Sequence, residues 1–274
     1  MGKDLTMQIF NTLINQPITN ILVAIYQLLH AIGIPFALGF SIIALTALIR
    51  LLLFPFTASQ MRASKKMQEV QPHVNRLKEK HKSNPQKLQQ ETMQLYKEFG
   101  INPVAGCLPM LVQLPIIWGL YGVLNNTVRA TSIEAVNKMI YIEGLKLDKL
   151  WDTQFFGLPV GSSPAELIKT AGPLILLVPV LTGVLQFVQS RMMFKPAESK
   201  AIVGKSAASK KTEKKPGGDF ASAMQTQSMY VFPVMIGFFA NRFPLGLSLY
   251  WNTFTVFGII QQYIMDKGKR AVGK

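Results

Sequence analysis

The sequence predicts an all-α integral membrane protein with five transmembrane helices, an N-terminus outside the cell and a C-terminus in the cytoplasm. Three observations lead to this fold class. Hydrophobic residues make up 49% of the 274 residues and charged residues only 16%. The apolar residues gather in runs long enough to cross a bilayer. The segments between the runs are alternately rich and poor in Lys and Arg, as the positive-inside rule describes.

The five apolar runs define the expected spans. They cover residues 35–58, 104–125, 172–190, 228–242 and 246–265. Asn102-Pro103 and Gly172-Pro173 open two of these runs, and a proline at the first helical position loses no hydrogen bond there. The fourth run is short and Arg242-Phe243-Pro244 follows it. We therefore expect the fourth and fifth spans to form a tight hairpin.

The orientation follows from the basic residues. Segment 59–103 carries nine Lys and Arg residues and segment 191–227 carries eight, whereas segment 126–171 carries five, balanced by five acids. The tail, 266–274, carries four. Segments 59–103, 191–227 and 266–274 are thus expected in the cytoplasm, and 1–34 and 126–171 outside. The N-terminus, "MGKDLTMQIFNTL", resembles neither a signal peptide nor a transit peptide, so we expect a multi-pass protein of the bacterial plasma membrane.

Residues 18–33 admit two interpretations. The apolar residues of this segment follow helical spacing, while Thr19, Tyr26 and His30 lie on the opposite side. This pattern favours an amphipathic helix in the outer membrane interface, as part of an extracytoplasmic N-terminal segment, 1–34. A sixth span is the alternative, but it would spoil the alternation of charge.

The first cytoplasmic segment, 59–103, is predicted to be a helical hairpin. Its apolar residues form two helical stripes, Met67, Val70, Val74 and Leu77, and then Leu88, Leu95 and Phe99, with Thr92 between. Asn84-Pro85 starts the second helix and Gly100 ends it, while Pro72 falls at a kink or near a helix start. The hairpin is either a solvated pair of helices without a partner or a basic platform for lipid headgroups, a ribosome or an incoming chain.

The second basic segment, 191–227, is expected to be a flexible linker. Its central part, 195–219, is rich in Lys, Ser, Ala and Gly and lacks apolar periodicity. "GKS" at 204–206 resembles the end of a phosphate-binding loop, but no strand precedes it and position 199 is Ser rather than Gly. The basic charge therefore indicates topology and lipid contact, and we expect no specific nucleic acid partner.

Arg50 is the unusual residue of the first span. It lies about 13 Å of helix from the cytoplasmic end at Ser59. The simpler interpretation is an anchor whose side chain reaches the headgroups. However, Arg62, Lys65 and Lys66 already supply anchors at the boundary, and no Asp or Glu occurs in any of the five spans.

An unpaired guanidinium at this depth costs at least about 2.5–3.5 kcal/mol, so it requires water or hydrogen-bond acceptors. Polar residues of the other spans can supply that setting, and they fall on shared helical faces. They are Gln113, Thr182, Gln186, Gln189, Ser248, Asn252, Thr255 and Gln262, with Trp251 beside them. Each alone is typical of contacts between helices. Together with Arg50 they predict a hydrated, positively charged cavity that is open toward the cytoplasm.

The residues of this predicted cavity include no candidate catalytic group. None of the three histidines lies in an expected span, no nucleophile pairs with a base, and Cys107 is the only cysteine. We therefore expect a protein that is not an enzyme and uses no metal and no cofactor.

The residues resemble the YidC/Oxa/Alb family of membrane protein insertases. Three stretches carry the resemblance, in order: "SIIALTALIRLLLFPF" at 41–56, "LKEKHKSNPQKLQQETMQLYKEFGINPVAGCLPMLVQLPIIWGLY" at 77–121 and "FPLGLSLYWNTFTVFGIIQQ" at 243–262. The combination is specific, since "GCLPMLVQLPI" directly after "YKEFGINP" is hard to meet by chance.

The resemblance implies a hydrophilic groove, open to the cytoplasm and the lipid, that holds one essential arginine. By the motif this arginine is Arg50, while Thr46 and Trp251 match positions that meet the substrate. The third-span glutamine of the motif is Gln189, with Gln186 as the alternative. The full set of expected groove residues is Arg50, Thr46, Gln113, Gln186, Gln189, Asn252 and Trp251.

The resemblance also implies the partners. Nascent membrane proteins and the lipid bilayer are the expected ones, and the ribosome, the signal recognition machinery and the Sec translocon are candidates. The short tail, "DKGKRAVGK", argues against tight tethering to a ribosome. The spans are expected to be irregular at their prolines, Pro55, Pro109, Pro115, Pro179 and Pro233.

Two other functions remain open on the residues alone. A small-molecule transporter or anion channel would also use an intramembrane arginine, although such proteins favour internal repeats and this sequence has none that we recognise. A purely structural chaperone would use the hairpin of 59–103, with Arg50 as packing only.

Overall fold

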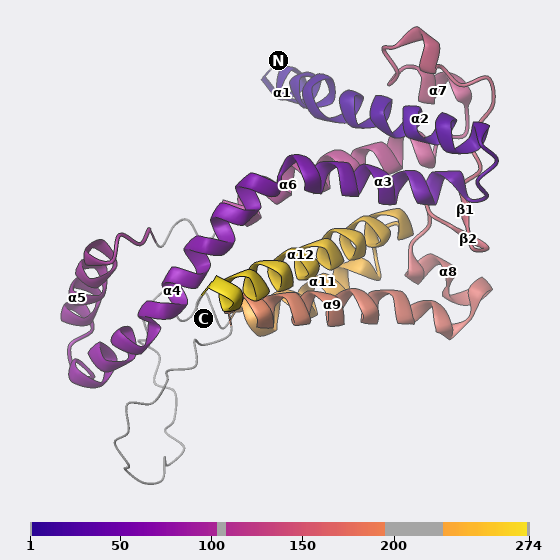
Figure 1. Ribbon diagram of the computed structural model, residues 1–274. Coiled ribbons are helices and arrows are strands. Elements are labelled where there is room, and N and C mark those ends of the chain that lie inside the picture. Colours follow the sequence, from indigo (N-terminus) through magenta and orange to yellow (C-terminus); the bar gives the residue numbers. More distant parts are fainter. Residues whose placement is uncertain (1, 103–107, 195–226, 273–274) are drawn as a thin grey trace.

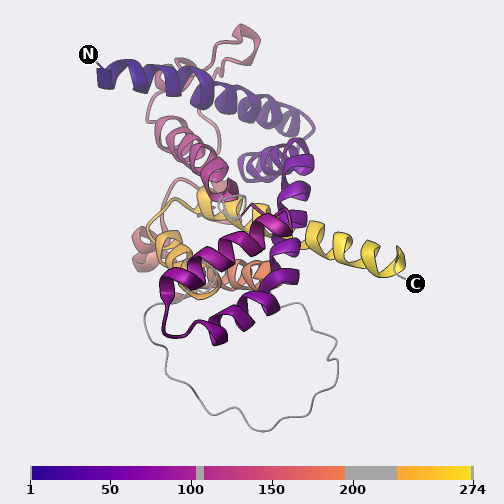
Figure 2. The ribbon, with the colours of Figure 1, turned by 90° about the vertical axis from the view of Figure 1, so that its left-hand side faces the viewer.

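The structure, a computed structural model, describes residues 2–102, 108–194 and 227–272. Most of these residues lie in helices, which form an elongated bundle (Figure 1). One pair of helices projects from one end of the bundle, and Figure 2 shows this pair side by side in front of it. The opposite end is covered by residues 126–171. Cys107 and the expected linker at 195–219 lie outside the described residues.

The N-terminal arm is continuous helix, formed by α1 (Gly2–Phe10), a π-helical turn (Asn11–Asn15) and α2 (Gln16–Ala31). Its protein-facing side differs from the apolar stripe that the sequence suggests. Thr19 and Tyr26 are buried, whereas Leu28 and Ile32 are more than 60% exposed. The apolar stripe thus points partly away from the protein, and its placement in the outer interface stays a prediction.

The helix expected over 35–58 is broken. Helix α3 (Ala37–Leu52) and helix α4 (Phe54–Lys80) meet at Leu53, where the axis bends by 64°. Pro55 explains the break, because it has no N–H to donate to the carbonyl one turn earlier and its ring crowds that carbonyl. Helix α4 then continues without interruption into the expected cytoplasmic hairpin, so the two segments share one helix.

Helices α4 and α5 (Pro85–Glu98) form the hairpin, as the sequence predicts. The Asn84 side chain accepts a hydrogen bond from the Lys87 backbone N–H and so caps α5, while Gly100 has a φ of 61° just after its end. Pro72 lies inside α4 rather than at its start. The small core between the helices is Val70, Val74 and Tyr96.

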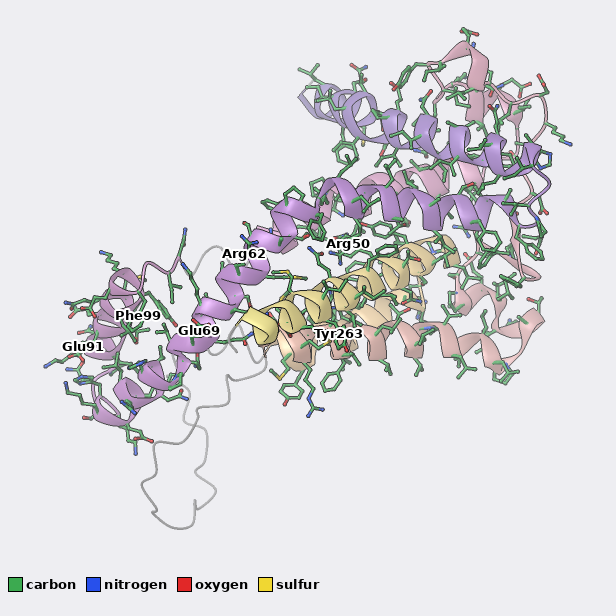
Figure 3. All side chains as sticks on the ribbon, viewed as in Figure 1. Arg50, Arg62, Glu69, Glu91, Phe99 and Tyr263 are labelled. Carbon is green, nitrogen blue, oxygen red and sulfur yellow. The ribbon has the colours of Figure 1, made fainter. Side chains whose placement is uncertain are left out.

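One predicted member of the hairpin stripes is not part of the small core. Phe99 (Figure 3) is about half exposed, and its ring lies beside that of His73. Tyr96, which the predicted stripes did not include, is buried in the core. At the tip, His81 Nε2 and Glu91 Oε2 lie 2.8 Å apart. The hydrogen bond with His81 lowers the pKa of Glu91 below its usual value, which favours the charged carboxylate.

Segment 126–171, for which the charge pattern predicts only a position outside the cell, is an ordered cap. Helix α6 (Leu108–Val123) and a π-helical turn (Leu124–Val128) lead into it. It contains α7 (Ile133–Asn137), a 3₁₀ turn (Glu143–Leu145), the two-residue antiparallel strands β1 (Gln154–Phe155) and β2 (Leu158–Pro159), and α8 (Pro164–Ala171). We call residues 126–171 the outer cap.

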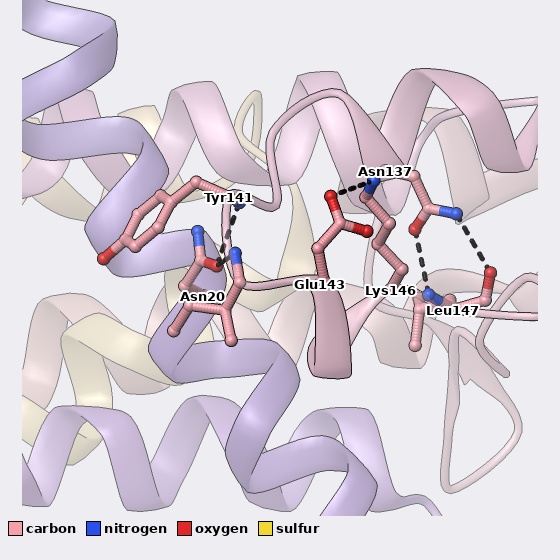
Figure 4. Close-up of polar contacts among 7 residues, drawn as sticks. Asn20, Asn137, Tyr141, Glu143, Lys146 and Leu147 are labelled. Atoms are coloured by element: carbon pink, nitrogen blue, oxygen red, sulfur yellow. Dashed lines mark hydrogen bonds and ion pairs between the residues drawn. The ribbon is translucent and has the colours of Figure 1, made fainter.

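Asn20 of α2 fixes the outer cap to the N-terminal arm (Figure 4). Its side-chain oxygen accepts hydrogen bonds from the backbone N–H groups of Tyr141 and Ile142, at 3.2 and 3.3 Å, and its amide donates to the Met139 carbonyl at 3.1 Å. Within the cap, Asn137 makes the same kind of two-way contact with the backbone of Leu147. These amides satisfy backbone groups that the irregular chain leaves unpaired.

Glu166 organises the end of the outer cap. It forms a capping box with Ser163 at the start of α8, and Arg129 Nη2 donates to both of its carboxylate oxygens, at 2.8 and 2.9 Å. The Ser163 backbone N–H, and then Arg129, hold the pKa of Glu166 below its usual value. Backbone hydrogen bonds from Leu245 and Gly246 to cap carbonyls join the cap to the following helices.

The remaining helices complete the bundle. Gly172 begins the third expected span, as predicted, and a 3₁₀ turn (Pro173–Leu176) leads into α9 (Leu177–Phe194). A π-helical turn (Gln227–Val231) and α11 (Phe232–Ala240) precede α12 (Leu245–Val272), and a short connection joins α11 to α12. The buried core, which includes Leu22, Leu38, Ile42, Leu124 and Tyr250, lies toward the outer cap.

By length and composition, one helix among the described residues can cross a membrane, Pro173–Met193. The bent pair α3 and α4 is a second candidate, and Gln227–Ala240 is a shorter apolar helix. The described part of the chain is therefore mostly helical and contains membrane-spanning candidates, while the number of five spans stays a prediction.

Candidate functional site

Arg50 lies in the last turn of α3, three residues before the bend at Leu53 (Figure 3). Its side chain crosses to α12, where Nε and Nη2 donate to the backbone carbonyl of Phe254 at 3.0 and 2.6 Å. Its Cζ also lies 3.5 Å from the centroid of the Phe254 ring. A helix C-terminus, a carbonyl and an aromatic face all favour a cation, so Arg50 is buried without an acidic partner among the described residues.

A cavity of about 420 Å³ opens beside Arg50. Its polar wall collects side chains from α3, α4, α6, α9 and α12. They include Arg50, Thr57, Gln60, Gln113, Thr182, Gln186, Gln189, Ser190 and Ser248. The apolar part of the lining, which we call the apolar wall, is formed mainly by Leu53, Phe56, Met61, Ile117, Met235, Ile236, Phe239 and Phe243. The hollow is thus amphiphilic, and more apolar than the sequence suggested.

The glutamines of the cavity also join helices. Gln113 of α6 donates to the hydroxyl of Tyr250 on α12 at 2.7 Å. The indole N–H of Trp251 donates to Gln186 Oε1 at 3.0 Å, which links α12 to α9. These bonds cross between helices that are far apart in the sequence, so the polar wall is held together by its own side chains.

Five of the seven residues expected at the groove line the cavity: Arg50, Gln113, Gln186, Gln189 and Trp251. Thr46 does not, because it is fully buried one turn before Arg50 and its hydroxyl donates to the Ile42 carbonyl at 2.6 Å. Asn252 also lies outside the lining.

A stripe of buried polar atoms runs along α12. Within the described residues, four of its side-chain oxygens have no hydrogen-bond partner: Ser248 Oγ, Asn252 Oδ1, Thr255 Oγ1 and Gln262 Oε1. Their spacing of three, four and seven residues places them on one face of the helix. Such atoms gain a favourable interaction from any water or polar group that reaches them. We call these four residues the α12 stripe.

Helix α4 forms the side of the cavity nearest the hairpin. Gln261 Nε2 donates to the hydroxyl of Thr57 at 2.9 Å, and Ser64 Oγ donates to the Met193 carbonyl at 3.2 Å. Lys65 is paired with Asp266 of α12. Helix α4 is therefore attached to the ends of both α9 and α12.

Sequence reasoning missed Phe254 and Gln60. Phe254 contributes a backbone carbonyl, and because every residue type has one, the sequence does not indicate which carbonyl is used. The aromatic ring of Phe254, which lies one turn from both Tyr250 and Gly258, was the only sign in the sequence. Gln60 lines the cavity because α4 continues past the expected end of the span. Among the described residues, no group of three or more His, Cys, Asp or Glu side chains is placed to hold a metal ion.

Comparisons with known proteins identify a family and several relatives. The model of a family described as 60Kd inner membrane protein matches residues 12–271. A protein of Clostridium perfringens named membrane protein insertase YidC is 32% identical over 269 residues, which cover 94% of this chain and 95% of the relative.

Proteins of the same name from other bacteria are similar to the same degree. The one from Fusobacterium nucleatum is 32% identical over 231 residues, covering 84% of this chain and 87% of the relative. The one from Oceanobacillus iheyensis is 32% identical over 233 residues, covering 84% and 74%. With a family match over residues 12–271 and relatives that are 32% identical over at least 84% of its length, the chain belongs to the 60Kd inner membrane protein family.

Proposed function

We propose that the chain is an insertase of the bacterial inner membrane, which moves hydrophilic segments of nascent membrane proteins into the bilayer through the cavity beside Arg50. The observation that carries the proposal is a buried cation on the polar wall of an otherwise apolar hollow. The name of the relatives, membrane protein insertase YidC, supports the same function.

The proposed placement in the membrane has five spans, formed by the bent pair α3–α4, α6, α9, α11 with its preceding π-helical turn, and α12. The hairpin of α4 and α5 then lies in the cytoplasm, and the outer cap and α2 lie outside. The exposed apolar residues Leu28 and Ile32 are consistent with contact between α2 and lipid. In this placement the cavity opens toward the cytoplasm and the outer cap closes its far end.

The proposed mechanism uses the two walls for the two kinds of segment in a single-span substrate. A short hydrophilic N-terminal segment with acidic residues enters along the polar wall, where Arg50 acts as a temporary counter-ion and lowers the cost of desolvation. The apolar segment moves along the apolar wall into lipid, driven by burial of apolar surface. The membrane potential assists the outward movement of negative charge.

Residues of the cavity have distinct proposed roles. Arg50 meets acidic groups of the substrate, Gln113, Gln186, Gln189 and Trp251 offer hydrogen bonds to its backbone, and Thr46 and Asn252 act from positions next to the cavity. No covalent chemistry, cofactor or nucleotide enters the mechanism. Insertion without the Sec translocon, or beside it, is compatible with the same cavity, and ribosome and signal recognition machinery remain candidate partners.

The test is reconstitution of the full chain in liposomes with a single-span substrate that has an acidic translocated tail. Arg50→Ala is expected to abolish insertion, because the acidic segment loses its counter-ion, whereas Arg50→Lys largely retains it. A matched substrate with a neutral tail separates the effect of charge from general damage. Normal insertion of the acidic substrate by the Arg50→Ala variant would contradict the mechanism.

A crosslinker at position 251 separates an insertase from a small-molecule transporter or anion channel. Trp251 lines the cavity and faces Gln186, so a photoreactive residue there should capture a stalled nascent chain of an inserting substrate. If no chain is captured at 251 while small anions cross the same liposomes, the transporter is the better interpretation. The broad apolar wall favours the insertase, since a small anion gains nothing from it.

A further inference from the structure

Gly258 lies at the point where α3, α9 and α12 meet. It is buried on α12, one turn after Phe254 and on the same face. A Cβ atom at this position would lie 2.5 Å from Nη2 of Arg50 and would also overlap the side-chain amide of Gln189. Real side chains do not tolerate such contacts, so the guanidinium and the amide occupy the space that the missing side chain leaves free.

The absence of a side chain at 258 determines how Arg50 is held. Because Nη2 lies against the backbone of α12 at Gly258, the guanidinium can reach back to the Phe254 carbonyl with two donors and lie over the Phe254 ring. The two interactions together fix both the position and the plane of the group. Any larger residue at 258 would push the guanidinium away from this carbonyl.

We propose that Gly258 is a positioning residue that holds Arg50 in a resting position on α12, from which an acidic group of the substrate must displace it. The inference rests on the proposed function and adds to it the control of how readily Arg50 is available. At rest the guanidinium of Arg50 is bound by the Phe254 carbonyl and ring. During insertion a carboxylate replaces the carbonyl, which is the weaker acceptor for a guanidinium.

The experiment measures the reaction of Arg50 with phenylglyoxal, a reagent for arginine, in the full chain reconstituted in liposomes. Peptide mass spectrometry reports the rate at Arg50 relative to the half-exposed Arg129 in the same sample. Gly258→Ala is expected to raise the relative rate at Arg50 about tenfold, because losing the hydrogen bonds or the ring contact is worth about a factor of ten. An unchanged relative rate in this variant would overturn the proposal.

Gly246→Ala is the matched control. Gly246 is another crowded glycine of the same helix, where a Cβ atom would lie 2.9 Å from Cδ2 of Leu124, away from Arg50. It is expected to leave the relative rate at Arg50 unchanged. If Gly246→Ala raises the rate as much as Gly258→Ala does, the effect is general loosening of α12 and the proposal fails.

A second variant decides the matter if Gly258→Ala does not fold. Phe254→Leu keeps the carbonyl and creates no overlap but removes the ring, so it should raise the rate at Arg50 about threefold. Phe254→Tyr keeps the ring and should restore the original rate. Equal rates in the original chain and in Phe254→Leu would contradict the resting position.

Insertion assays distinguish the failure of this inference from failure of the proposed function. With Arg50 released, Gly258→Ala should raise the ratio of acidic-tail to neutral-tail insertion above that of the original chain. Arg50→Ala should lower this ratio toward zero, because only the acidic tail depends on the counter-ion. A normal ratio in Arg50→Ala refutes the function. A lowered ratio in Arg50→Ala together with an unchanged ratio in Gly258→Ala refutes the resting position alone.

Discussion

The polar side chains at the outer cap and those of the α12 stripe differ in how many hydrogen-bond partners they have. At the cap, Asn20 of α2 and the cap residues Asn137 and Glu166 each make two or more hydrogen bonds. Along the stripe, four side-chain oxygens are buried without a partner in the described part of the chain. A satisfied network resists rearrangement, whereas an unpaired buried oxygen leaves about 1–3 kcal/mol to be gained by a new hydrogen bond. The difference indicates a fixed closure at one end and an adaptable interior beside it.

The largest expected effect compares two tryptophans. Trp151 is buried in the cap, where its ring meets the edge of Tyr26 and its N–H donates to the Thr127 carbonyl. Trp151→Ala should lower the free energy of unfolding by about 3–5 kcal/mol, because it leaves a large cavity in the core. Trp118 is 61% exposed at the cavity, so Trp118→Ala should change stability by less than about 0.5 kcal/mol. Thermal unfolding in detergent checks both, and similar losses would contradict the fixed closure.

The next comparison is between two asparagines. Asn20→Ala strands two backbone N–H groups and one carbonyl of the outer cap, so it should destabilise the fold by about 1–3 kcal/mol. Asn252→Ala removes an oxygen that has no partner and should be nearly neutral for stability. Hydrogen exchange of residues 139–142 gives a local measurement, since it should rise in the Asn20 variant only. Equal protection in both variants would count against the role of Asn20.

A pair of buried threonines should show effects of opposite sign. Thr46→Val removes a hydrogen bond to the Ile42 carbonyl and should cost about 1 kcal/mol. Thr255→Val removes a buried hydroxyl without a partner at nearly constant volume, so it should be neutral or stabilising by up to about 1 kcal/mol. Denaturant unfolding of the two variants tests the sign. A loss in Thr255→Val as large as in Thr46→Val would show that the hydroxyl of Thr255 is satisfied after all.

The smallest expected effect concerns pH. The pKa of Glu166 is lowered in the folded protein, so its contribution to stability is present above its ordinary value of 4.5 and is lost as the pH falls through the lower folded value. Glu166→Gln should therefore unfold with a weaker pH dependence below about 4.5. Because the Glu166 side chain is about half exposed, the difference should be small and sensitive to salt. Unfolding curves from pH 3 to pH 6 provide the measurement, and identical slopes for both proteins would contradict the expectation.

Periodicity and capping chemistry predicted much of the interior from the sequence. The start of α5 at Asn84-Pro85 and the meeting of Gln113, Gln186, Gln189 and Trp251 at one cavity with Arg50 follow from residue types at helical spacing. These features are local, or they depend on which face of a helix is polar. The resemblance to a family then supplied the expected role of Arg50, which spacing alone left open.

Other features depended on contacts that no local pattern encodes. The acceptor for Arg50 is the backbone carbonyl of Phe254, and every residue has such a carbonyl. The hydrogen-bond partners of Asn20 lie about 120 residues later in the chain, so the ordered structure of the outer cap could not be predicted from the sequence. In α2, apolar spacing could not distinguish lipid from protein, and Tyr26 is buried while Leu28 is exposed.

The unbroken course of α4 has a mechanical consequence. Its first turns form part of the cavity wall through Phe56, Thr57 and Gln60, and its far end carries α5 at a distance of about 36 Å. A helix transmits displacement along its axis, although Pro72 would reduce this effect if α4 bends there, because proline lacks one backbone hydrogen-bond donor. A displacement of the α4–α5 tip would therefore also move the cavity wall, with the bend at Leu53 as the pivot.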